Sequence, residues 1–193
     1  MPEKSSGHRA VRYIPVFLLV VSVTLNVFLA RKIRELRQIE ASLRAEADLQ
    51  PGETVPPLQV KTVEGNTISF QYGTSALPMV IYILSPSCTW CQRNEHSVEA
   101  LSRSIGNKYR FIGISIESGD LNQYSKDRNV TFPVYTPELT MYSSYKLGSG
   151  TPQTIVVSSD GRVLKNWHGA YNDALKREIE DYFTINLPEL PSP

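Results

Sequence analysis

The only two cysteines of this 193-residue chain, Cys88 and Cys91, are separated by two residues and follow an apolar run. The run from Met79 to Leu84 has the length and composition of a central β-strand that is covered on both faces. Residues 91–104 then carry apolar side chains at helical spacing. This order places the first sulfur at a helix N-terminus, where free N–H groups and the helix dipole stabilise a thiolate.

The arrangement predicts a dithiol redox site in which Cys88 is the nucleophile. The Cys88 thiolate attacks a disulfide of a partner, and Cys91 then resolves the mixed disulfide, so that the two cysteines end as a disulfide. This exchange needs no cofactor. The spacing leaves two other interpretations open: a zinc or copper site completed by His96 and His168 or by carboxylates, and a purely structural disulfide.

The composition excludes several classes of protein. With 20 basic and 19 acidic side chains the formal net charge is +1, so the overall charge does not indicate a nucleic-acid partner. Two cysteines are too few for a scaffold in which disulfides replace a core. The length allows one domain of ordinary size and an appendage.

The N-terminal part of the chain differs in composition from the remainder. Residues 13–30 contain no charged side chain and follow a basic segment at 1–12. Eighteen helical residues span roughly 27 Å, close to the thickness of the bilayer hydrocarbon, and we therefore expect a single transmembrane anchor. A cleaved signal peptide is disfavoured because a cut after Ala30 would place Phe28 at the −3 position. A buried soluble helix is the third alternative.

Residues 31–50 predict a helical stalk, because they contain no glycine or proline and carry a short apolar stripe. The stripe covers fewer than two heptads, which is enough only for a weak homodimer through the stalk. Acidic and basic side chains nearly balance around the anchor, so charge alone does not fix its orientation. Prolines and a glycine then mark the start of a domain at 51–185, and a Pro-rich tail occupies 186–193.

Strand and helix patterns alternate within the domain, which favours an α/β fold. The expected strands are 58–63, 67–70, 79–84, 111–116, 154–157 and 163–167, and the expected helices are 91–104, 121–128, 138–145 and 171–183.

The domain resembles the thioredoxin-like superfamily and, within it, the membrane-anchored TlpA/ResA-like thiol–disulfide oxidoreductases. The resemblance covers residues 52–183 and depends on the Cys-x-x-Cys placement and on Thr151-Pro152, which precedes an expected strand. It implies a central mixed sheet flanked by helices. It also implies that the Thr151–Pro152 bond is cis, that Pro152 packs beside the dithiol and that the Thr151 backbone contacts substrate. Trp90, between the cysteines, is a further candidate for substrate contact.

The function implied by this resemblance is disulfide exchange with extracytoplasmic protein substrates, by a single-pass protein of the inner membrane whose domain faces the periplasm. A redox partner supplies or accepts electrons, and no nucleic acid is involved. A second reading is a non-catalytic assembly or metal-delivery factor on the same fold, because residues 85–88 also look like accessory redox proteins of methylamine dehydrogenase maturation. The chain departs from its relatives at Tyr82 and Asn94, where thioredoxin and many ResA-like proteins, respectively, carry a carboxylate.

Overall fold

The computed structural model describes residues 7–117 and 119–191, and for residues 7–14, 16, 40–47 and 148 it describes only the secondary structure. The chain divides into two compact units, Met1–Glu46 and Ala47–Pro193. Each unit is described by itself.

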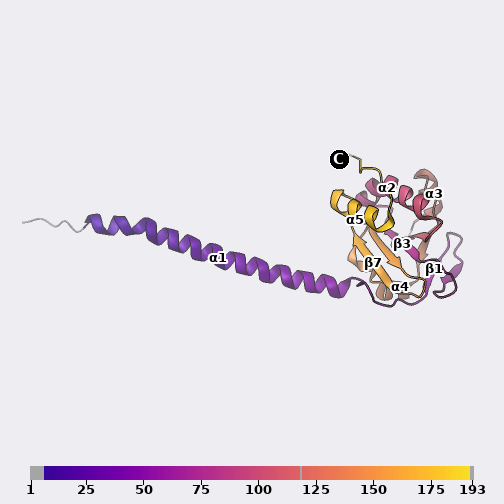
Figure 1. Cartoon of the computed structure of the whole chain (residues 1–193), viewed down its shortest axis with the longest axis horizontal. Coiled ribbons are helices and arrows are strands. Elements are labelled where there is room, and N and C mark those ends of the chain that lie inside the picture. The colour runs from indigo at the N-terminus through magenta and orange to yellow at the C-terminus, as the bar shows by residue number, and fades with distance from the viewer. Residues whose placement is uncertain (1–6, 118, 192–193) are drawn as a thin grey trace, which may run out of the picture. The chain divides into compact units, whose positions relative to one another are not determined.

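The first unit consists of helix α1, Gly7–Ala47 (Figure 1). Among the described residues, no helix has both the length and the apolar character that crossing a membrane requires. The expected anchor at 13–30 includes residues 13, 14 and 16, whose side chains lie outside the described part, as do those of the expected basic segment 1–12. The anchor therefore stays a prediction.

The second unit contains one seven-stranded sheet in the order β2-β1-β5-β4-β3-β6-β7. Strands β3, β4 and β5 are parallel, whereas β1, β2, β6 and β7 run antiparallel to their neighbours. The strands are β1 Leu58–Lys61, β2 Thr67–Phe70, β3 Met79–Leu84, β4 Arg110–Ser115, β5 Val134–Pro137, β6 Gln153–Val157 and β7 Val163–His168. This confirms the expected mixed sheet in an α/β fold.

Helices cover both faces of the sheet (Figure 1). They are α2 Thr89–Ile105, α3 Leu121–Asp127, α4 Leu139–Ser144, a 3-10 turn at Leu147–Ser149 and α5 Asp173–Phe183. Side chains of β3 alternate between two cores: Val80, Tyr82 and Leu84 pack with α2 and α5, whereas Ile81 and Ile83 pack with residues of α4. Burial on both faces explains why β3 is a continuous apolar run, and it fixes the strand end from which the Cys-x-x-Cys segment begins.

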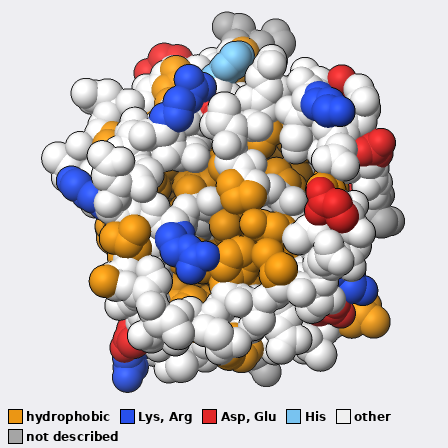
Figure 2. Space-filling model, turned by 90° about the vertical axis from the view of Figure 1, so that its right-hand side faces the viewer, with side chains coloured by type: hydrophobic (Ala, Val, Ile, Leu, Met, Phe, Trp, Pro, Cys, Tyr) orange, Lys and Arg blue, Asp and Glu red, His pale blue; other side chains and the backbone are white. Residues whose placement is uncertain are grey.

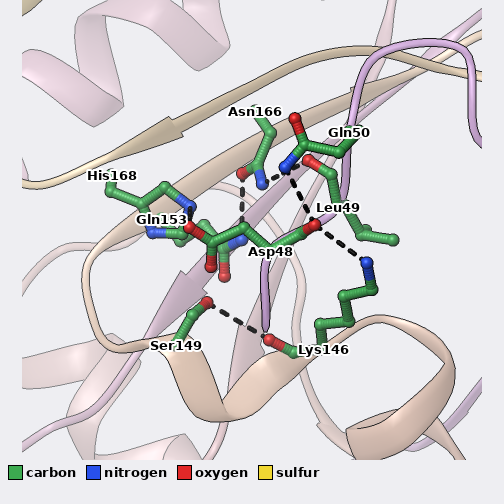
Figure 3. Close-up of polar contacts among 8 residues, drawn as sticks. All are labelled: Asp48, Leu49, Gln50, Lys146, Ser149, Gln153, Asn166 and His168. Atoms are coloured by element: carbon green, nitrogen blue, oxygen red, sulfur yellow. Dashed lines mark hydrogen bonds and ion pairs between the residues drawn. The ribbon is translucent and has the colours of Figure 1, made fainter. Parts of the chain in front are cut away.

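A polar cluster attaches the start of the second unit to the sheet (Figure 3). Lys146 Nζ donates to the Asp48 carbonyl at 2.9 Å, and Asn166 Nδ2 donates to the Leu49 carbonyl at 2.9 Å. Gln153 Nε2 in turn donates to Asn166 Oδ1 at 2.9 Å. Leu49 is buried, so the compact unit includes residues that the sequence pattern assigned to the stalk.

Candidate functional site

Cys88 is the N-cap residue of helix α2, which starts at Thr89, two residues earlier than the start at Cys91 expected from the sequence. Its Sγ accepts a hydrogen bond from the Cys91 backbone N–H at 3.2 Å. The sulfur thus takes the place of the hydroxyl or carboxylate oxygen that usually satisfies this N–H group, at the positive end of the helix dipole.

The Thr151-Pro152 segment lies against the first cysteine, although 63 residues separate Thr151 from it. The Cys88 thiol donates to the Thr151 carbonyl at 3.6 Å, and the Thr151–Pro152 peptide bond is cis, as expected. Pro152 is buried, and its carbonyl accepts from Gly169 N at 2.8 Å. Three of the predicted site residues, Cys88, Cys91 and Thr151, are therefore brought together.

The pKa values of the two thiols are shifted in opposite directions. Burial raises the pKa of Cys88, but hydrogen bonds from the Cys91 thiol, the Thr151 side chain and two backbone N–H groups together outweigh it, so its pKa lies below the ordinary value. Burial raises the pKa of Cys91 to about 12, and the hydrogen bond with Cys88 adds to the rise. Cys88 is half-buried and Cys91 fully buried, and both are free thiols. Their predicted disulfide stays a prediction.

A small cavity of about 10 Å³ reaches Cys91, and Glu95 and Tyr124 are among the residues that line it. Burial raises the pKa of Glu95, although its ion pair with Arg128, at 3.2 Å, acts in the opposite direction. The cavity has room for about one water molecule. Sequence reasoning missed Glu95, although its position four residues after Cys91 places both on one face of the helix.

Tyr82 and Asn94, the two positions that lack the relatives' carboxylates, contact each other. Asn94 Nδ2 donates to the Tyr82 hydroxyl at 3.3 Å, and Asn94 Oδ1 accepts from Tyr171 N at 2.9 Å. These buried bonds join α2 to β3 and to the segment before α5. Two carboxylates, Glu95 and Glu99, line the cavity that reaches Cys91, and Glu99 accepts hydrogen bonds from Thr131.

Glu117 fixes the turn that precedes Cys88, a contact that sequence reasoning also missed. Its Oε2 accepts hydrogen bonds from the Ser85 hydroxyl, from Ser87 Oγ at 2.7 Å and from Ser87 N at 3.4 Å. These three bonds lower the pKa of Glu117. Cys88 N also donates to the Ser85 carbonyl at 3.1 Å. The segment that follows β4 therefore holds the turn that presents the nucleophile.

No protein-family model and no curated protein matches this sequence. Solved structures do resemble it. A putative protein disulfide isomerase from Bacteroides thetaiotaomicron is 15% identical, with a TM-score of 0.60 over 70% of this chain and 89% of its own. A thioredoxin-family thiol:disulfide interchange protein from Chlorobium tepidum is 18% identical, with a TM-score of 0.54 over 70% and 97%. The domain has the thioredoxin-like fold.

A third neighbour of this thioredoxin-like domain is a secreted disulfide oxidoreductase from Mycobacterium tuberculosis. It is 17% identical, with a TM-score of 0.51 over 64% of this chain and 94% of its own. The three structural neighbours are thus named as a putative disulfide isomerase, a thiol:disulfide interchange protein and a disulfide oxidoreductase.

Trp90 lies in the first turn of α2 of the thioredoxin-like domain, and its side chain is 55% exposed. The Arg93 guanidinium carbon lies 4.7 Å from the centre of the indole ring, a cation–π distance. The predicted substrate-contacting residue is therefore accessible beside the nucleophile.

The contacts described for the two histidines proposed as alternative metal ligands do not involve Cys88 or Cys91. His96 is exposed on α2, and His168 Nε2 contacts Asp48 Oδ2 at 3.4 Å (Figure 3). Within the described part of the chain, no group of three or more histidine, cysteine, aspartate or glutamate side chains could hold a metal ion.

Proposed function

We propose that the chain is a thiol–disulfide oxidoreductase that exchanges disulfides with protein substrates through Cys88 and Cys91. The observation that carries this proposal is the asymmetry of the pair: Cys88 caps a helix and has a lowered pKa, whereas Cys91 is buried with a pKa raised to about 12. Such a pair separates the nucleophile from the resolving thiol.

The steps follow from this asymmetry. The Cys88 thiolate attacks one sulfur of a substrate disulfide, the other substrate sulfur leaves as a thiolate, and a mixed disulfide forms. Cys91 then loses its proton and attacks Cys88 Sγ, which releases the substrate thiolate and leaves a Cys88–Cys91 disulfide. The substrate gains two electrons that the two thiols lose. The reverse sequence oxidises a substrate dithiol.

Protein substrates are favoured by the backbone of Thr151, which lies against Cys88 at 3.6 Å. An extended peptide beside this segment could form main-chain hydrogen bonds, the recognition mode used where a strand is added to existing backbone.

We further propose that residues 13–30 anchor the protein in the inner membrane and that the domain faces the extracytoplasmic side. Large apolar side chains of α1 between Phe17 and Leu29 are exposed, and such a surface needs a covering such as lipid. Stable disulfides form outside the reducing cytosol. The description of one structural neighbour as secreted agrees with this location.

A trapping experiment tests the proposed chemistry. Cys91→Ser should accumulate mixed disulfides between Cys88 and protein substrates, because the resolving thiol is gone, and the adducts should disappear after reduction. Cys88→Ser is the matched control and should trap nothing. Trapping by Cys88→Ser alone would contradict the assigned roles. The measured redox potential then gives the direction, since a value of about −270 mV indicates a reductase and one of about −120 mV an oxidase.

A further inference from the structure

The exposed indole of Trp90 is held in place by its neighbours. Arg93 lies over its ring at 4.7 Å, and Arg93 Nη2 donates to the Pro191 carbonyl at 3.1 Å. Trp90 therefore keeps more than half of its surface in solvent while a cation braces it from one side. Large aromatic side chains fixed in this way lose little entropy on binding, and they often dominate the energy of protein interfaces.

The C-terminal tail, residues 184–191, holds Arg93 through the Pro191 carbonyl and packs against two helices. Its contacts are a buried Leu187, a hydrogen bond from Ser97 Oγ to the Pro188 carbonyl at 3.2 Å, and an ion pair between Glu189 and Lys176. These contacts connect α5 with the active-site helix, and the Pro191 carbonyl accepts the hydrogen bond from Arg93.

The charge of Arg93 is not neutralised within the described part of the chain, where no carboxylate forms an ion pair with it. By contrast, Arg103, in the last turn of the same helix, pairs with Glu99 at 3.7 Å. A half-buried guanidinium without a counter-ion, next to an exposed indole, is complementary to an acidic and partly apolar partner.

The position of Arg93 limits where the partner's acidic residue lies. Five residues from Cys88 to Arg93 correspond to a helical rise of about 7.5 Å and a rotation of about 140°, which together separate the two Cα atoms by about 9 Å. An extended peptide covers this distance in about two to three residues.

We propose that Trp90 and Arg93, braced by the C-terminal tail, bind protein segments that carry an acidic residue about two positions from the reactive cysteine and an apolar residue beside it. The apolar side chain packs on the indole, and the carboxylate pairs with the guanidinium. This inference rests on the proposed function, because it names the substrate class of the same site.

Two probe peptides of seven residues test the proposal. Each carries one central cysteine as a mixed disulfide with thionitrobenzoate and a leucine next to it. One peptide has glutamate and the other lysine at both positions two residues from the cysteine. Attack by Cys88 on the peptide sulfur forms the protein–peptide disulfide and breaks the bond to thionitrobenzoate, whose coloured thiolate is released. The mixed disulfide of 2-mercaptoethanol with thionitrobenzoate is the small-molecule reference.

The reduced full-length protein should react about fivefold faster with the glutamate peptide than with the lysine peptide at low ionic strength, and the ratio should approach one in about 0.5 M salt. Arg93→Gln should bring the ratio close to one at low salt. Trp90→Ala should slow both peptides, and deletion of residues 188–193 should lower the ratio because Arg93 loses its contact with Pro191. Dividing each peptide rate by the rate of the same variant with the small reference separates a change in peptide binding from a change in the Cys88 thiol itself.

Arg103→Gln is the matched control on the same helix and should keep the wild-type ratio. Equal rates of the wild-type protein with the two peptides would overturn the proposal, as would an equal effect of Arg103→Gln and Arg93→Gln. Failure to release thionitrobenzoate from any probe, the small reference included, would overturn the proposed function as well. A normal rate with the small reference and no peptide preference would overturn the docking surface alone.

Discussion

Cys88 and Cys91 carry the same chemical group in opposite environments, and their alkylation should show it. Because hydrogen bonds hold the pKa of Cys88 below the ordinary value, its reaction with iodoacetamide should persist at pH values where an ordinary thiol is protonated. Cys91 should stay unreactive near neutral pH, since its pKa is raised to about 12. Rate–pH profiles of Cys91→Ser and Cys88→Ser measure the two thiols separately. A Cys91 that reacts readily at pH 7 would contradict this picture.

Because Glu95 and Cys91 line the same cavity, we expect Glu95 to accept the proton that Cys91 must lose through a water molecule in that cavity. Its carboxylate form accepts a proton, and burial raises its pKa. Resolution of the mixed disulfide should therefore slow as the pH falls through this raised pKa. Glu95→Gln should slow the second step by at least about tenfold and leave the first unchanged.

Acid quenching of single turnovers followed by mass spectrometry measures the lifetime of the mixed disulfide in wild type and in Glu95→Gln. Glu178→Gln, which changes an exposed carboxylate on α5, serves as the control. An unchanged lifetime of the mixed disulfide in Glu95→Gln would contradict the proposal that Glu95 accepts the proton of Cys91.

At the scale of elements, the turn between β3 and α2 depends on a contact with Glu117, in the segment that follows β4. The serine hydroxyls of this turn donate to Glu117, and the turn positions Cys88 as the cap of α2. Ser85→Ala combined with Ser87→Ala should loosen the cap and raise the pKa of Cys88 toward the ordinary value. Titration of the thiolate absorbance near 240 nm measures the change.

Ser158→Ala is the matched control for the paired serine substitution, because Ser158 donates to Asp160 in the same way but in the loop between β6 and β7. It should leave the Cys88 titration unchanged. If the paired variant also titrates like the wild type, the contact with Glu117 has no part in setting the thiol.

The packing of β4 against the active-site core requires a glycine at Gly113. A Cβ there would lie 2.9 Å from the Phe132 ring and 3.2 Å from a Val134 methyl group, closer than side chains normally approach. Gly113→Ala should lower the free energy of unfolding by about 1–3 kcal/mol. Gly106→Ala is the control, because Gly106 has helical dihedral angles and only ordinary contacts, and it should be neutral or slightly stabilising. Equal urea midpoints for the two variants would contradict the argument.

At the scale of the whole molecule, local pattern was enough to predict most elements of the domain. The apolar run Met79–Leu84 is a strand with the predicted bounds. These bounds could be predicted because a strand buried on both faces carries apolar side chains at every position. Strand β5 was missed: Val134–Pro137 is short, pairs with β1 and β4 over two residues each and therefore depends on partners distant in the chain.

The polar parts of the site could not be predicted for the same reason. Glu117 accepts hydrogen bonds from the turn before Cys88 only because the parallel pairing of β3 with β4 brings it beside Ser85, 32 residues earlier. Arg93 is held beside Trp90 by a hydrogen bond to the carbonyl of Pro191, which lies 98 positions later in the chain. Spacing in the sequence identified the two cysteines, whose chemistry is local, but not the side chains that the fold gathers around them.

The proposed anchor predicts where the whole protein is found. Because Cys91 is buried, Cys88 is the thiol that an added reagent can reach. After mild reduction, a membrane-impermeant maleimide should label Cys88 in intact spheroplasts, Cys88→Ser should abolish the label, and a cytosolic thiol protein should stay unlabelled until lysis. The protein should also remain with membranes in high salt, and deletion of residues 1–30 should release the domain. Protection of Cys88 until lysis would contradict the extracytoplasmic location, and release by salt would contradict the anchor.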